Sequence, residues 1–93
     1  MTIGLLEAKF SLPEAHSLKD KRMLVRSMKE RVIARMNVSA AEVDNQDFWK
    51  SAKFAFVTVS GDRKIAEKRI ADLLTFIRSD PRMILLDVQT SFL

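Results

Sequence analysis

The sequence predicts an α+β fold in which four strands and two helices follow one another in the order βαββαβ. Three observations support this prediction. Apolar residues alternate with the two-residue period of a strand in four segments, and they recur with a helical period in two others. Pro13, Gly61, Pro81 and two polar stretches separate these segments. The 93 residues provide one hydrophobic core, and 47% apolar with 30% charged residues is typical of a folded chain. We therefore expect a single domain over residues 1–93.

The first strand is predicted over Thr2 to Leu12, with one face formed by Gly4, Leu6, Ala8 and Phe10. Pro13 ends this strand because it has no N–H for the ladder. Ser17 is the expected N-cap of a helix, with Asp20 three residues later in a variant of the capping box. At about 100° per residue, the buried stripe of that helix is expected to consist of Leu18, Val25, Met28, Val32 and Met36.

A second strand is predicted over Val38 to Asp44 because the strand-like alternation resumes there. A polar connection follows over residues 45–51 and carries Phe48 and Trp49. We expect Trp49, together with Phe48, to anchor this connection on the edge of the core, with base stacking as the alternative role.

Lys53 to Ser60 is expected to be a central strand because β-branched and aromatic residues dominate it. Asp62 is the expected N-cap of a second helix, and Pro81 follows the end of that helix. Its buried stripe is expected to consist of Ala66, Ile70, Leu73, Leu74 and Ile77. The last strand, Met83 to Phe92, is expected to carry on one face Ile84, Leu86, Val88 and Phe92. Right-handed crossovers then put both helices on one side of a four-stranded antiparallel sheet, a ferredoxin-like sandwich whose other face is open.

The charge pattern favours an anionic partner. Sixteen Lys and Arg residues against twelve Asp and Glu give a formal net charge of +4. Several cations crowd the first turns of the first helix, where free backbone N–H groups already make the helix end positive, and this placement suits phosphate. The sequence therefore predicts binding of structured RNA, or of the ribosome, through Lys19, Lys21, Arg22, Arg26 and Lys29. The alternative is that these side chains only reach into solvent.

The central strand allows a second hypothesis, which depends on its parity. If its odd-numbered residues face the helices, Phe54 and Phe56 lie on the open sheet face near Leu5 and form an apolar patch. Such a patch favours a protein partner, a homodimer, or base stacking on the exposed rings. The opposite parity buries both phenylalanines in the core, and the two-residue period is compatible with either arrangement.

Motifs that carry catalysis are not found in the sequence. The chain has no Cys, one His and two Gly, which excludes disulfides, a Cys/His zinc cluster and a glycine-rich phosphate loop. Glu42, Asp44 and Asp47 could bind a divalent cation or share a proton, but pairing with the basic helix is the alternative. We expect no catalytic residue, no metal and no cofactor. The sequence shows neither a signal peptide nor a membrane-spanning apolar stretch, so we expect a cytoplasmic protein without a membrane partner.

Four segments together resemble a known family. They are HSLKDKR (16–22), NVSAAEVDNQDFW (37–49), VSGDR (59–63) and LLDVQTSFL (85–93). The sequence resembles the YlxP-like family, small bacterial proteins grouped as a domain of unknown function. The resemblance implies a ferredoxin-like domain in the bacterial cytosol and a gene often found among translation and ribosome-maturation factors. It implies no reaction and no settled catalytic or binding residues.

Overall fold

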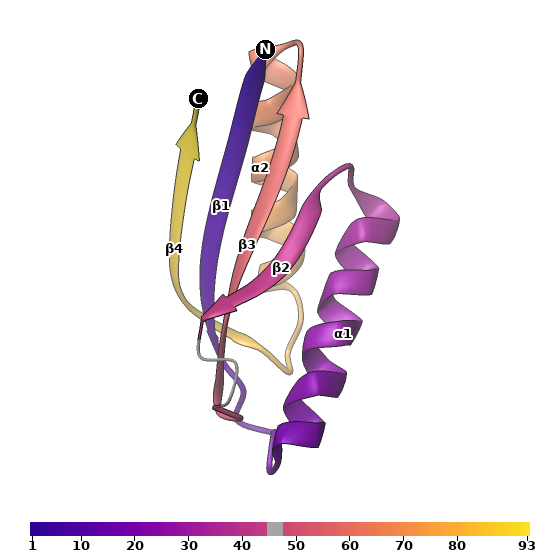
Figure 1. Cartoon of the computed structure of the whole chain (residues 1–93), viewed down its shortest axis with the longest axis vertical. Helices are drawn as coiled ribbons and strands as arrows, with labels where there is room; N and C mark the ends of the chain where they lie inside the picture. The colour runs from indigo at the N-terminus through magenta and orange to yellow at the C-terminus, as the bar shows by residue number, and fades with distance from the viewer. Residues whose placement is uncertain (45–47) are drawn as a thin grey trace.

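The computed structural model describes residues 1–44 and 48–93, and its helices and strands follow the predicted order. The strands pair antiparallel in the order β2-β3-β1-β4, and α1 and α2 lie on one side of the sheet (Figure 1). The predicted ferredoxin-like α+β sandwich is therefore confirmed. Its elements are β1 (Thr2–Ser11), α1 (Leu18–Arg35), β2 (Ser39–Asp44), β3 (Ser51–Ser60), α2 (Arg63–Arg78) and β4 (Ile84–Phe92).

Both predicted helix caps are present. The Ser17 hydroxyl accepts a hydrogen bond from the Asp20 backbone N–H at 3.0 Å, and the Asp20 carboxylate accepts one from the His16 backbone N–H at 3.0 Å. These two bonds hold the start of α1 in one orientation relative to the loop before it. The Asp62 carboxylate accepts from the Lys64 backbone N–H at 2.8 Å and caps α2.

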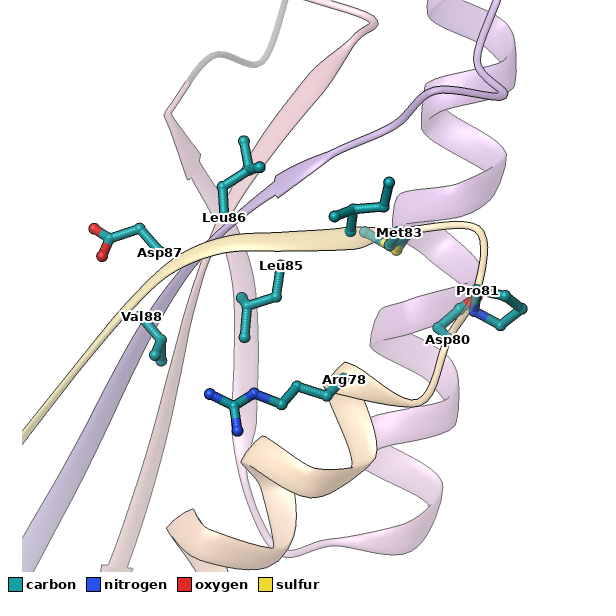
Figure 2. Close-up of a pocket in the computed structure, with 9 residues that line it drawn as sticks. Arg78, Asp80, Pro81, Met83, Leu85, Leu86, Asp87 and Val88 are labelled. Atoms are coloured by element: carbon teal, nitrogen blue, oxygen red, sulfur yellow. The ribbon is translucent and has the colours of Figure 1, made fainter.

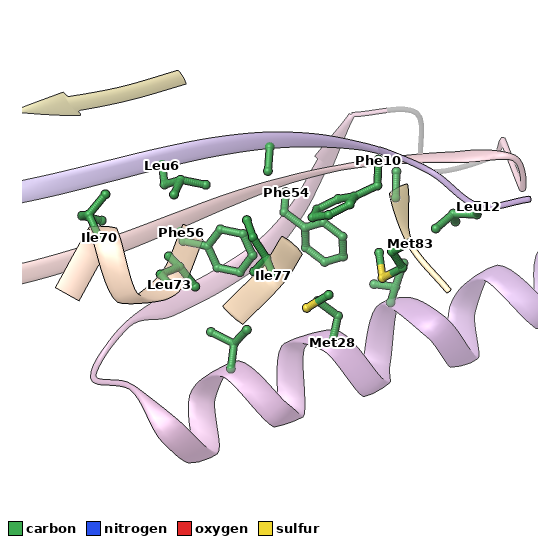
Figure 3. Packing of buried hydrophobic residues seen from close by; sticks show 14 of the residues in the cluster. Leu6, Phe10, Leu12, Met28, Phe54, Phe56, Ile70, Leu73, Ile77 and Met83 are labelled. Atoms are coloured by element: carbon green, nitrogen blue, oxygen red, sulfur yellow. The ribbon is translucent and has the colours of Figure 1, made fainter. Parts of the chain in front are cut away.

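The core lies between the sheet and the two helices (Figure 3). The register of β1 against β3 sets Leu6 opposite Phe56 and Ala8 opposite Phe54, all four on the helical side of the sheet. The Phe54 ring packs edge-on against Phe10 and stacks on Phe56, with centroid distances of 5.7 Å in both pairs. Phe54 and Phe56 are fully buried, so the predicted interface built on them is wrong. This parity is favoured because two aromatic side chains remove more apolar surface from water than Ala55 and Val57.

The last strand departs from simple alternation. Asp87 pairs with Lys9 whereas Leu85 pairs with Phe10, so Leu86 is an extra residue at a β-bulge. As a result Leu85 packs against the core and Leu86 is 57% exposed. The predicted apolar face of this strand is therefore wrong for Ile84 and Leu86, which are exposed. It is confirmed for Val88 and Phe92, which pack against the core.

Candidate nucleic-acid interface

Four of the five predicted RNA-binding residues lie on the outer face of α1. We call Lys19, Arg22, Arg26 and Lys29 the α1 cation row. Their spacings of three and four residues make them neighbours on a helix surface. The row extends about 15 Å along the helix axis at 1.5 Å per residue. Lys19, Arg22 and Arg26 are exposed and Lys29 is half-buried.

The α1 cation row lacks counter-ions in the described part of the chain. Within residues 1–44 and 48–93, no ion pair or hydrogen bond engages the four side chains of the row. Several cations elsewhere are paired with carboxylates: Arg31 and Arg82 with Asp80, Arg63 with Glu67, Lys68 with Asp72, and Lys53 with Glu7 and Asp44. The row is therefore a source of uncompensated positive potential, which attracts anions.

Two shallow grooves run beside the α1 cation row. One has a volume of about 500 Å³ and includes Met23, which is 63% exposed. The other has a volume of about 360 Å³ and includes Ile33, which is 52% exposed. Glu30 lines both grooves, so one carboxylate lies beside the row. Apolar side chains next to cations suit a ligand that combines phosphates with flat, less polar groups.

Lys21 does not belong to this surface, and its predicted contact with RNA is wrong. The side chain is 1% exposed, and its Nζ lies 2.8 Å from Oε2 of Glu42 on β2, a carboxylate that is 17% exposed. Lys21 precedes Val25 by four residues and Met28 by seven, which puts it on the buried stripe of α1. The same spacing is visible in the sequence, but the charge of Lys21 favoured a surface position.

The carboxylates proposed as a cation or proton site are directed to different partners. Glu42 pairs with Lys21, whereas Asp44 Oδ2 lies 3.8 Å from Lys53 Nζ, beyond a bulge in the pairing of β2 with β3. Asp47 lies outside the described residues. In the part of the chain that the structure describes, no group of three or more His, Asp or Glu side chains could hold a metal ion.

Neither described helix is long and apolar enough to cross a membrane.

A groove of about 620 Å³ lies between the end of α2 and β4. Figure 2 shows Arg78 on the same side of β4 as Leu85 and Val88. The Asp80 carboxylate also lines this groove, but Arg31 and Arg82 donate to it at 2.9 Å. The hydrogen bond from the Arg82 side chain holds the pKa of Asp80 below its ordinary value of 3.8, although burial acts in the opposite direction. The carboxylate therefore stays ionised near neutral pH and is poorly suited to general acid chemistry.

The open sheet face carries a small apolar patch. Ile3 pairs with Val59 and Leu5 with Val57, and we call these four residues the open-face patch. Val57 and Val59 are 39% and 56% exposed, and the other two are half-buried. Leu5 is thus the one residue of the predicted protein interface that lies on the open face.

Phe48 and Trp49 are exposed instead of anchored. Phe48 is 67% exposed and Trp49 is 46% exposed, so the expectation that they pack on the core edge is wrong. Both precede β3, in a connection where sequence patterns give no periodic signal.

Comparisons with known proteins agree with the predicted resemblance. A family model described as "Protein of unknown function (DUF503)" matches residues 3–90. The "Uncharacterized protein YlxP" of Bacillus subtilis (strain 168) is 36% identical over 81 residues, which cover 87% of this chain and 88% of that protein. A solved structure titled "De novo designed protein Foldit4" superposes with a TM-score of 0.54 over 100% of this chain and 97% of that chain, at 12% identity, and supports the fold alone. The chain therefore belongs to the DUF503 family, a YlxP-like family of proteins of unknown function.

Proposed function

We propose that this protein is a non-enzymatic accessory protein that binds structured RNA, such as that of the ribosome, through the α1 cation row. The observation that carries the proposal is the set of four cations on one outer helix face without counter-ions among residues 1–44 and 48–93. Phosphates of RNA replace the missing counter-ions, and the release of condensed ions from the RNA drives binding.

The composition of the row supports phosphate as the bound group. Arg22 and Arg26 are one helical turn apart, and a guanidinium donates two parallel hydrogen bonds to a phosphate. Lys19 and Lys29 add point charges at the two ends of the row. Contacts of this type position a protein on RNA without reading its sequence. We therefore expect affinity for many structured RNAs and a strong dependence on salt.

The proposal is tested with two variants of equal charge. Lys19→Gln, Arg22→Gln, Arg26→Gln and Lys29→Gln together remove the row, and we expect binding to ribosomal subunits or a folded RNA to weaken by at least about tenfold at low salt. The matched control removes four exposed cations from α2 through Arg63→Gln, Lys64→Gln, Lys68→Gln and Arg78→Gln, and is expected to bind nearly as well as the wild type.

Two results would contradict the proposal. Equal losses in both variants would mean that net charge, not the α1 surface, governs binding. Full affinity in the α1 variant would mean that the row is a solvated helix face. Thermal unfolding of each variant checks that the fold is retained, since all eight side chains lie at the surface or are half-buried.

A second candidate function is self-association through the open-face patch. Four apolar side chains on an uncovered sheet face favour a second copy of the same patch, because burying them adds to a core limited by the size of the chain. Sedimentation equilibrium tests this candidate. A dimer that dissociates on Val57→Asp substitution supports it, and a wild-type monomer at high concentration removes it.

A further inference from the structure

Two neighbouring aromatic side chains are exposed at one end of the molecule. Phe48 and Trp49 leave 67% and 46% of their surface in contact with solvent. Large aromatic side chains usually bury most of their surface, and an adjacent exposed pair marks a surface that contacts a partner. Neither the protein core nor the open-face patch uses these two residues.

Hydrogen bonds hold this aromatic pair close to the start of α1. The Leu12 backbone N–H donates to the Lys50 carbonyl at 2.8 Å, and Lys50 Nζ donates to the Pro13 carbonyl at 3.3 Å. The residue after Trp49 is thus attached to the loop that leads from β1 into Ser17 and the first turn of α1. Figure 1 shows the start of β3 and the start of α1 at the same end of the molecule.

The α1 cation row begins at this same end, with Lys19 in the first turn of the helix. Exposed aromatics therefore lie at the same end of the molecule as the start of a line of cations that lacks counter-ions in the described part of the chain. This combination is typical of surfaces that bind single-stranded nucleic acid, because cations contact the backbone and bases stack on the rings. Paired bases are already stacked inside their helix, so only unpaired bases are available to such rings.

We propose that Phe48 and Trp49 form a stacking platform for unpaired bases of RNA whose phosphates lie along the α1 cation row. The inference rests on the proposed function and specifies its ligand as RNA with a single-stranded segment or loop. Charge complementarity favours RNA over an apolar protein segment at this place, because Lys50 follows the aromatic pair directly and Lys19 begins the α1 cation row at the same end of the molecule. Stacking is tolerant of base identity, so the platform selects unpaired structure and not sequence.

The test uses Trp49 as its own reporter, since it is the single Trp of the chain. A single-stranded oligouridylate of about 12 nucleotides, within the usual site sizes, is added to the full-length protein while Trp fluorescence is recorded. We expect saturable quenching by the single strand and little quenching by a duplex of equal length. Anisotropy of labelled RNA then gives affinities for variants that lack the fluorophore.

In that assay Trp49→Ala is expected to weaken binding of the single strand by about tenfold. This loss lies within the range measured when one stacking aromatic residue is replaced by alanine. Binding of the duplex should change little, and Trp49→Phe should restore most of the affinity because it keeps an aromatic face. The side chain is half-exposed, so the thermal unfolding temperature of Trp49→Phe is expected to stay close to that of the wild type.

The outcomes separate this inference from the proposed function. In one outcome, RNA binding depends on the α1 cation row while Trp49 fluorescence does not change and Trp49→Ala binds RNA as well as the wild type. This result overturns the stacking platform alone. Absence of any RNA binding overturns both. Loss of self-association in Trp49→Ala with unchanged RNA affinity also overturns the platform and assigns the aromatic pair to a contact between two copies of the chain.

Discussion

The ion pair between Lys21 and Glu42 allows a quantitative prediction, because it joins α1 to the edge strand β2 from a buried position. Glu42→Gln keeps the size of the side chain but removes the carboxylate charge that lies 2.8 Å from the Lys21 ammonium, which is 1% exposed. Removing one partner of a buried pair costs about 3–5 kcal/mol, and the 17% exposure of Glu42 places the expected loss near the lower value. For a chain of 93 residues, a loss of about 3 kcal/mol in the free energy of unfolding corresponds to a fall of about 15 °C in the unfolding temperature.

A double-mutant cycle isolates the pair from the other contacts of each residue. Unfolding in urea, followed by circular dichroism, gives the free energies of Lys21→Met, Glu42→Gln and the double variant. We expect a coupling energy of about 2 kcal/mol, with the double variant more stable than the sum of the single losses predicts.

The surface pair of Lys68 and Asp72 is a matched control for this cycle. Its atoms are 2.9 Å apart, almost the same distance, but the two side chains are 77% and 56% exposed. Its coupling energy, from Lys68→Met and Asp72→Asn, is expected to stay below about 0.5 kcal/mol. Equal coupling energies in the two cycles would contradict this prediction, because burial would then add nothing to the pair of Lys21 and Glu42.

Two further predictions concern the core and the pH dependence. Phe56→Ala is expected to lower the free energy of unfolding by about 3–5 kcal/mol, because its side chain is fully buried. Val57→Ala, on the open face, is expected to lower it by less than about 1 kcal/mol. Similar losses for the two variants in urea unfolding would contradict the parity of β3. The lowered pKa of Asp80 means that its stabilising contribution is complete above pH 3.8 and is lost as the pH falls below that value. The stability difference between the wild type and Asp80→Asn should therefore shrink in acid, and a difference that stays constant in acid unfolding curves would contradict the assignment.

The features that could be predicted from the sequence depend on local interactions. Ser17 and Asp62 cap their helices through bonds to residues three and two positions away, so a short segment contains all the information needed. The order of strands and helices follows from hydrophobic period alone. The cations of α1 were found in the same way, because the helical period puts Arg22 and Arg26 on one flank of the helix, beside its buried stripe.

The features that sequence analysis missed depend on contacts between distant segments. The two-residue period of β3 fits either parity, and only the packing of Phe54 against Phe10 decides between them. The bulge at Leu86 arises from the register of β4 against β1. Lys21 of α1 is buried because Glu42, on strand β2, compensates its charge. Each outcome needs a partner whose position follows only from the complete fold.

The salt dependence of RNA binding is the most direct test of the α1 cation row, because each phosphate contact contributes about 0.7–0.9 to the slope of log affinity against log salt concentration. The measurement compares the wild type with the variant that lacks Lys19, Arg22, Arg26 and Lys29 as cations. Binding through the α1 cation row predicts that the slope becomes shallower by about three in the variant. A variant slope equal to that of the wild type would show that RNA contacts a different surface and would contradict the account.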